Sequence, residues 1–317
     1  MKIKTIIIGM GSAGALDRFI DKRIKFQRNH LDAIKNNKSF QLVKLVDKNE
    51  NNILKKKKQI IKNITLEKKL SENEKEVDLI VICTPTESHF NDIKKALKLN
   101  PKIIICEKPL SNKIKETTEI LEILEKKQIK LIINYQRQFD KRFKELGKLF
   151  IKNKYNKFIL KYNNGFLNNA SHFLYFLYEL FGKIKKINQN YNLNYKNKKS
   201  FNFRIDFENN VEAHGIGFNN YSFDIFEIEA YNQNSRINIM DGGYYLEYYK
   251  KKDNTFFNNY SPLIKSKLKL SDYGDGFDNL YKRVLEFFKG KDDLDEFNSK
   301  KYSYFYKQLS KIKINEK

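Results

Sequence analysis

A glycine-rich turn near the N-terminus contains the first residues whose types and spacing suggest chemistry. The segment GMGSAG at 9–14 has the pattern GxGxxG and directly follows an apolar, β-branched run. Gly9 would permit a tight turn, Gly11 would let backbone N–H groups approach a pyrophosphate, and Gly14 would let a helix pack closely on the strand. We expect these glycines, with Ser12 and Ala13, to hold a dinucleotide. The alternative is a plain turn without a ligand.

A carboxylate ends the next apolar run. Asp47 would accept hydrogen bonds from both ribose hydroxyls of a dinucleotide. It lies 33 residues after Gly14, against a usual ~20. We attribute the surplus to a polar insertion at 17–28, after which the first helix resumes at about His30. The charge of Asp47 would repel a 2′-phosphate, which favours NAD over NADP, although Lys48 beside it weakens that preference. A structural Asp at a strand end is the alternative.

Two further polar groups follow predicted strands. Thr84 and Pro85, with His89 at the start of the next helix, come after one apolar run, and Glu107 and Lys108 come after another. The carboxyl edge of a parallel sheet is where such folds bind ligands. We therefore expect these residues to line a cofactor pocket, and Lys108 to hydrogen-bond a substrate oxygen near the nicotinamide. A solvated Lys at a strand end is the alternative interpretation.

Apolar runs and amphipathic patterns alternate in the first half of the chain. Runs typical of buried strands lie at 2–9, 42–47, 77–84, 102–106 and 131–133. Helical periodicity lies between them, at 90–99 and 114–124. This alternation predicts an α/β unit, a parallel sheet covered by helices on both faces.

The pattern changes after about residue 150. Strand-like segments now follow one another, at 157–162, 201–207, 211–218, 223–231, 236–240 and 244–249. Asn209-Asn210 and Gly242-Gly243 suit tight hairpins. Helical patterns lie at about 171–181, 277–289 and 294–312. We predict a mainly antiparallel sheet with helices on one face, and two domains, 1–134 and 135–317.

Four segments together resemble the Gfo/Idh/MocA family of nicotinamide-dependent oxidoreductases, typified by glucose–fructose oxidoreductase and inositol dehydrogenase. They are GMGSAG, ICTPTESHFNDIKKAL, PKIIICEKPL and NYQRQFD, in that order along the chain. The resemblance covers residues 1–182. It implies a Rossmann doubly wound domain, then an α+β domain whose open, mainly antiparallel sheet often forms a dimer interface. It also implies that Lys108 is catalytic.

The same resemblance gives roles to residues of the second domain. His172, in the segment GFLNNASH at 165–172, matches the family's catalytic His. Asn168 stands where the family usually has Asp, Ala170 replaces a Gly, and Tyr175 replaces a later Asp. Asn168 cannot take a proton, but its amide can orient the substrate or His172. Arg137 would help to position the substrate.

These residues predict an NAD-dependent oxidoreductase acting on a secondary hydroxyl or ketone of a sugar, sugar derivative or cyclitol. His172 would be the general base, and Lys108 would stabilise the developing alkoxide. One alternative is a nucleotide-sugar dehydrogenase or reductase of surface-polysaccharide synthesis. Another is a regulator that binds NAD(H) without turnover, which the missing Asp at 168 favours.

The net charge is strongly positive, with 62 Lys and Arg against 38 Asp and Glu, or +24. Eight of these cations are Arg, the preferred reader of bases and phosphates, and the Lys residues are spread along the whole chain. Asn and Ile are abundant and Trp is absent, as in an AT-rich coding sequence. We interpret the charge as composition, with attraction to an anionic substrate as the alternative, and expect no nucleic-acid partner.

Other residue types exclude further classes. Cys83 and Cys106 give no disulfide framework, and four dispersed His residues give no metal-ligand spacing. We expect no metal and interpret His30 and His214 as structural. No apolar run approaches the ~18–20 residues of a membrane span, and the N-terminal run is too broken by glycine for a signal peptide. We expect a cytoplasmic protein.

Aromatic residues are frequent in the second domain. Phe and Tyr occur at both alternating positions of its predicted strands, which would leave one sheet face apolar and exposed. This pattern predicts a homodimer or homotetramer formed through the C-terminal sheet.

Overall fold

The computed structural model describes residues 2–16, 25–49, 51–52, 64–71, 76–190, 200–253 and 261–312. The chain divides into two compact units. The first contains Met1–Phe139 and Gly274–Tyr306, and the second contains Asp140–Tyr273 and Lys307–Lys317. Within the described ranges, no helix has the length and apolar character needed to cross a bilayer.

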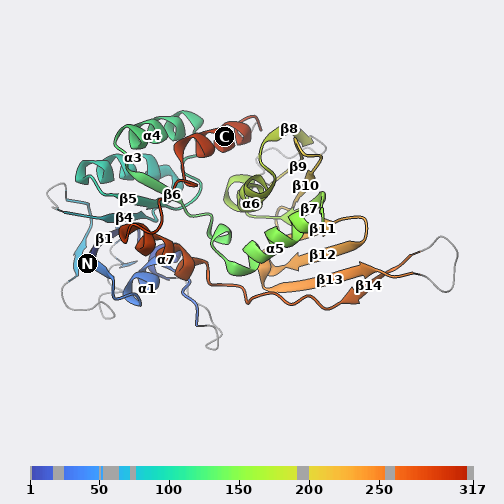
Figure 1. Cartoon of the computed structure of the whole chain (residues 1–317). Coiled ribbons are helices and arrows are strands. Elements are labelled where there is room, and N and C mark those ends of the chain that lie inside the picture. Colours follow the sequence, from blue (N-terminus) through green and yellow to red (C-terminus); the bar gives the residue numbers. More distant parts are fainter. Residues whose placement is uncertain are drawn as a thin grey trace. The chain divides into compact units, whose positions relative to one another are not determined.

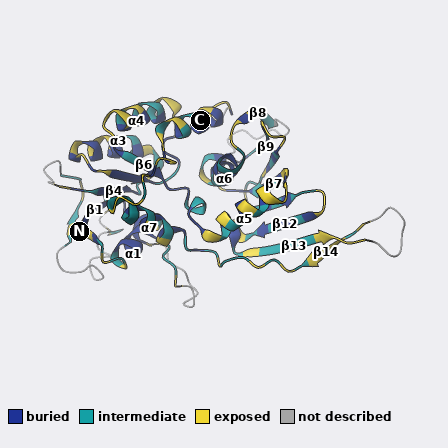
Figure 2. Cartoon of the chain, in the orientation of Figure 1, coloured by how far each residue is buried: buried dark blue, intermediate teal, exposed yellow. Residues whose placement is uncertain are grey.

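The first unit is built on a six-stranded, wholly parallel sheet (Figure 1). Its strand order is β3-β2-β1-β4-β5-β6, that of a doubly wound dinucleotide-binding fold. The strands are β1 (Ile3–Ile8), β2 (Phe40–Val46), β3 (Thr65–Glu67), β4 (Leu79–Ile82), β5 (Ile103–Cys106) and β6 (Lys130–Ile133). Every residue of β4 and β5 is buried (Figure 2), because helices cover both faces of a parallel sheet. The predicted fold class is confirmed.

Helices pack on the two faces of this sheet in pairs. The pairs in contact are α1 (His30–Lys35) with α7 (Gly276–Phe288), and α3 (Thr86–Ala96) with α4 (Ile114–Lys126). Figure 1 shows α3 and α4 on one side of the sheet, with α1 and α7 on the other. Helix α1 starts at His30, as predicted, and Asn29 caps it by accepting from the N–H of Asp32 at 2.8 Å. Most of the predicted insertion at 17–28 lies outside the described residues.

Residues 274–306 group with the first unit, whereas the sequence pattern assigned all of 135–317 to the second domain. The reason is a set of tyrosine hydroxyls that bond into the first unit. Tyr302 accepts from the N–H of Ile133 at 3.2 Å, and Tyr306 accepts from the N–H of Leu110 at 2.9 Å. Tyr281 of α7 reaches His30 at 2.7 Å. Local periodicity cannot reveal such long-range bonds.

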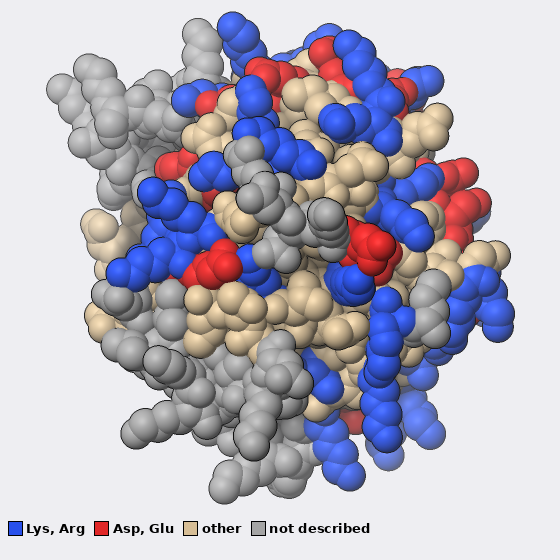
Figure 3. Space-filling model, turned by 90° about the vertical axis from the view of Figure 1, so that its left-hand side faces the viewer, with Lys and Arg blue, Asp and Glu red and all other residues tan. Residues whose placement is uncertain are grey.

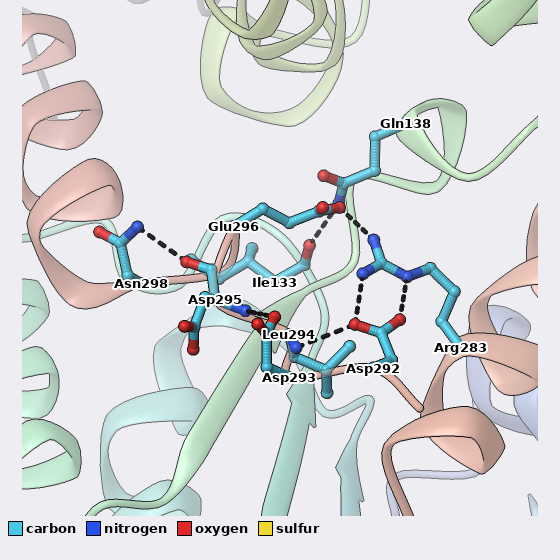
Figure 4. Close-up of polar contacts among 9 residues, drawn as sticks. All are labelled: Ile133, Gln138, Arg283, Asp292, Asp293, Leu294, Asp295, Glu296 and Asn298. Carbon is cyan, nitrogen blue, oxygen red and sulfur yellow. Dashed lines mark hydrogen bonds and ion pairs between the residues drawn. The ribbon is translucent and has the colours of Figure 1, made fainter. Parts of the chain in front are cut away.

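An acidic turn fixes the approach to α8 (Ser299–Leu309), and Arg283 of α7 is at its centre (Figure 4). The guanidinium forms two bonds with Asp292, Nε to Oδ2 at 2.7 Å and Nη2 to Oδ1 at 2.8 Å, and also contacts Glu296. The predicted helix at 294–312 begins later, at Ser299, because Leu294 has a left-handed φ of 55° inside this turn.

The second unit is built on an eight-stranded sheet of order β14-β13-β12-β11-β7-β10-β9-β8. All neighbouring pairs are antiparallel except β7 and β10, as the sequence predicted. The strands are β7 (Lys157–Tyr162), β8 (Ile184–Asn190), β9 (Asn202–Phe207), β10 (Glu212–Gly217), β11 (Phe226–Tyr231), β12 (Ser235–Met240), β13 (Tyr245–Lys251) and β14 (Leu263–Ser266). Both predicted hairpins are present, with positive φ at Asn210 and at both glycines of the second.

Two helices belong to the second unit, α5 (Lys141–Lys152) and α6 (Ser171–Phe181). Helix α6 has the predicted bounds and is buried along most of its length. Helix α5 was not predicted, because its span overlapped the assumed domain boundary. It buries Phe143, Leu146 and Phe150, three and four residues apart, a spacing typical of a helix that packs with one face.

The open face of this sheet differs from the aromatic face expected from the sequence. Phe203 and Phe207 alternate with polar residues and are buried on one and the same face. The other face carries paired charges: Lys161 binds Glu229 at 2.6 Å, and Lys157 binds Glu212 at 2.7 Å. Phe223 is exposed in the connection before β11, and Tyr245 is exposed at the start of β13. This face is therefore mixed, with charged pairs beside exposed side chains such as Ile216, rather than uniformly aromatic.

Candidate active site

The glycine-rich turn joins β1 to a short helical segment, Ser12–Leu16. Gly9 has φ +93°, and a Cβ there would lie 2.5 Å from the carbonyl carbon of Cys83. A Cβ on Gly14 would lie 2.1 Å from the carbonyl oxygen of Gly9, so these two glycines are required by packing. A Cβ on Gly11 would have nothing within 4 Å, and Ser12 is exposed. The space beside Gly11 would therefore let a pyrophosphate approach this backbone.

Asp47 ends β2 beside this turn. Its Oδ2 accepts from the N–H of Met10 at 2.6 Å and from the amide of Asn52 at 3.1 Å, and its Oδ1 accepts from the N–H of Asn49 at 2.7 Å. A carboxylate has about four acceptor positions, so capacity remains for a ribose hydroxyl. Lys48 is exposed. The glycine-rich turn thus fits the pyrophosphate of a dinucleotide, and the adjacent Asp47 carboxylate fits its ribose.

The loops after β4 and β5 are joined by His89. Its Nδ1 lies 2.9 Å from the carbonyl oxygen of Pro109, and its Nε2 lies 2.7 Å from that of Thr84. The ring is 1% exposed, which differs from the expected position lining a cofactor pocket. Thr84 also donates its hydroxyl to Asp92 at 2.8 Å, and Pro85 is exposed. His89 therefore holds together the two loops that a cofactor would contact.

Lys108 lies two residues after the end of β5 and is half-buried at the carboxyl edge of the sheet. Burial lowers the pKa of its ammonium to about 8; the Glu107 carboxylate opposes this shift, and the Arg137 guanidinium contributes to it. Arg137 lies in the single turn after β6. An amine with a pKa so close to neutrality can stabilise charge or take part in proton transfer.

Glu107 is held by residues that the sequence did not connect to it. Its Oε1 accepts from Asn134 Nδ2 at 2.7 Å and lies 3.2 Å from Nε2 of His30. Burial raises the pKa of Glu107, but the hydrogen bonds from His30 and Asn134 and the charge of Lys108 outweigh it, so the pKa lies below its usual value. His30 and Glu107 are 77 residues apart, so no local pattern could have revealed the contact.

His172 and Asn168 belong to the second unit, in and just before α6. Asn168 is exposed and donates to the carbonyl oxygen of Asn164 at 3.3 Å, and His172 is half-buried. The segment before α6 is anchored by Asn163, which donates to the carbonyl of Phe223 at 2.6 Å and accepts from the N–H of Ile225 at 2.9 Å. This anchoring fixes the start of the helix that carries His172.

Lys and Arg side chains are scattered over the face shown in Figure 3, with acidic and uncharged residues between them. This distribution matches the even spread of Lys along the sequence. The face drawn there thus lacks the single continuous basic stripe that is typical of a backbone-tracking nucleic-acid site.

Comparison with known proteins finds a family match within the first unit. Residues 23–135 match the Gfo/Idh/MocA family, described as an oxidoreductase family with an NAD-binding Rossmann fold. The chain is 39% identical over 71 residues to the uncharacterized oxidoreductase YrbE of Bacillus subtilis (strain 168). It is 32% identical over 73 residues to inositol 2-dehydrogenase of Rhizobium meliloti (strain 1021). These matches cover 22% and 23% of this chain, and 20% and 22% of those proteins, so the chain matches about a fifth of each relative's length.

Solved structures extend the likeness to both units at the level of the fold. The WlbA dehydrogenase from Bordetella pertussis, crystallised in complex with NADH and UDP-GlcNAcA, has a TM-score of 0.73 and 14% identity, covering 98% of this chain and 94% of that one. The family resemblance predicted from the four motifs is confirmed. Residues 23–135 match the Gfo/Idh/MocA family of oxidoreductases, and the unit that contains them has the strand order of the Rossmann fold by which that family is described.

Proposed function

We propose that this protein is an NAD-dependent oxidoreductase that acts on a secondary hydroxyl or ketone of a sugar, sugar derivative or cyclitol. The observation that carries the proposal is Lys108, a half-buried amine whose pKa is lowered to about 8 at the carboxyl edge of the parallel sheet. The open glycine-rich turn follows β1 of the same sheet, and parallel strands end at one edge, so a dinucleotide's phosphates and a substrate oxygen would be bound at that edge.

Oxidation of a secondary alcohol removes a hydride from carbon and a proton from oxygen. The nicotinamide, when bound, supplies the hydride acceptor. His172 would take the hydroxyl proton as general base. Lys108 would donate a hydrogen bond to the oxygen as negative charge develops on it. Asn168 and Arg137 would position the substrate, since both carry hydrogen-bond donors and are at least partly exposed.

NAD is the cofactor we propose, with NADP less favoured. Asp47 supports this choice because its carboxylate already accepts the N–H of Met10 in the glycine-rich turn and would repel a 2′-phosphate placed at the ribose. Gly9, Gly11, Gly14, Ser12 and Ala13 would surround the pyrophosphate.

A nucleotide-linked sugar is the second candidate substrate. It is supported by the WlbA dehydrogenase, which was crystallised with NADH and UDP-GlcNAcA, whereas the inositol 2-dehydrogenase match supports a free cyclitol. The half-buried Arg137 near Lys108 could bind an anionic group of such a substrate.

A substrate panel tests the proposal. Purified protein is mixed with NAD and, separately, with myo-inositol, free hexoses and UDP-linked hexoses, and NADH formation is followed by its absorbance. We expect hydride transfer with at least one class, and the class identifies the substrate. Protein that binds NADH but reduces NAD with no member of the panel would instead support a regulator without turnover.

A further inference from the structure

A buried polar chain runs from α7 to the residue beside Lys108, and the proposed reaction does not use it. Tyr281 of α7 lies 2.7 Å from Nδ1 of His30, and Nε2 of His30 lies 3.2 Å from Oε1 of Glu107. His30 and Tyr281 are 0% and 1% exposed. Asn134, at the end of β6, donates to the same Oε1 at 2.7 Å. Two segments distant in sequence thus reach one carboxylate, and a third, α7, holds the histidine.

The direction of the bonds follows from the chemistry of the groups. An ionised carboxylate can only accept hydrogen bonds, so Nε2 of His30 carries the proton toward Glu107 in either protonation state of the ring. The Tyr281 hydroxyl can donate to Nδ1 when the ring is neutral. The ring is also fixed edge-on against Phe277, with centroids 4.8 Å apart. His30 therefore has one orientation, and that orientation aims a donor at Glu107.

The carboxylate so held is the opposing charge for Lys108. Among the described residues, the Glu107 carboxylate favours the ammonium form of Lys108, and the Arg137 guanidinium opposes it. Burial and the charge of Glu107 together raise the pKa values of Cys83, Cys106 and Tyr281, so these groups stay neutral. The Glu107 carboxylate thus opposes burial and the Arg137 charge, which both favour the neutral form of the Lys108 amine.

We propose that His30, supported by Tyr281, is a positioning residue that fixes Glu107 as the counter-ion of Lys108 and so keeps the amine in its ammonium form. The inference rests on the proposed function, because it concerns the group that would stabilise the substrate oxygen. It gives a role at the site to a histidine that sequence reasoning treated as structural.

The test measures the ionisation of Lys108 directly, without turnover. Acetic anhydride modifies neutral amines, and mass spectrometry of the Lys108 peptide between pH 6 and pH 10 gives the pH at which this side chain titrates. Glu107→Gln should lower that midpoint by about one pH unit or more, the range for losing an adjacent opposite charge. His30→Leu cannot donate a hydrogen bond to Glu107 and should lower the Lys108 midpoint by less than Glu107→Gln does. His30→Gln can donate this bond and should restore the wild-type midpoint.

Two matched variants complete the design. Tyr281→Phe removes one oxygen and keeps the ring, and should give a small downward shift. His214→Leu removes a histidine that pairs with Glu212 on the second unit's open face at 3.5 Å, and should leave the midpoint unchanged. Circular dichroism checks that each variant folds. If His30→Leu does not fold, the titration midpoints of the Glu107→Gln and Tyr281→Phe variants test the inference.

Equal midpoints in wild type and Glu107→Gln would overturn the inference, as would equal midpoints for His30→Leu and wild type. Either result would leave His30 as a packing residue and would not affect the proposed function, since the wild type would still transfer hydride. Failure of the proposed function appears differently: no hydride transfer by the wild type, with the titration of Lys108 still measurable.

Discussion

Replacing Gly11 by Ala separates a ligand-binding role of the glycine-rich turn from a structural one. A Cβ at this position has no atom within 4 Å, and the φ of Gly11 is not in the left-handed region. The folded state therefore accommodates Ala, and the free energy of unfolding should stay constant or rise by about 0.4–1 kcal/mol, because Ala restricts the unfolded chain. A pyrophosphate that approaches this backbone would meet the new methyl group. We expect the affinity for NADH to fall at least tenfold, or about 1.4 kcal/mol.

Gly14→Ala is the matched control, because its Cβ would lie 2.1 Å from the carbonyl oxygen of Gly9. That variant should lose about 1–3 kcal/mol of unfolding free energy, the range for overpacking. Urea denaturation measures the stability of both variants, and NADH fluorescence titration measures binding. A Gly11→Ala variant that binds NADH as tightly as the wild type would refute the assignment of the pyrophosphate to this turn.

Three further predictions address the choice of cofactor, the acidic turn before α8 and the oligomeric state. Asp47→Ala should narrow the gap between NADH and NADPH affinity in a fluorescence titration; equal affinities in the wild type would remove the basis for choosing NAD. Arg283→Met should cost about 1–3 kcal/mol in urea denaturation because it leaves Asp292 uncompensated in a partly buried turn, whereas Lys130→Met, which breaks an exposed pair with Asp295, should cost less than about 1 kcal/mol. Light scattering at micromolar concentration should give a dimer or tetramer, and a monomer would end the proposal of assembly through the C-terminal sheet.

The elements that the sequence predicted are those whose signal is local. The strands of the parallel sheet are continuous apolar runs, and β7 and α6 have the predicted bounds. The short strand β3, Thr65–Glu67, has one apolar residue and gives no such signal. Helix α8 contacts the first unit through tyrosine hydroxyls that bond across 169 and 196 residues, and α7 does so through Tyr281, which reaches His30 across 251 residues. No periodicity encodes these bonds.

The candidate site divides in the same way. The spacing of the glycines predicted the tight turn at Gly9 and the close packing at Gly14, because both features depend on the turn itself. The role of Gly11 stays a prediction. His89 has the expected place in the sequence, but its two bonds to carbonyl oxygens turn it into the protein interior. The bond between His30 and Glu107 is created by tertiary packing alone, so a histidine with no motif around it was interpreted as structural.

The most direct test of the account is the kinetics of Lys108→Ala, measured beside His172→Ala and the double variant on the substrate found in the panel. Lys108→Ala should lower kcat and kcat/KM together by about 10²–10³-fold, the scale for losing one stabiliser of a developing oxyanion, with NADH affinity nearly unchanged. The double variant should lose less than the sum of the single losses, because both groups serve one proton transfer. Full activity in Lys108→Ala, or unchanged kcat with weakened NADH binding, would contradict the assignment of this amine to the substrate oxygen.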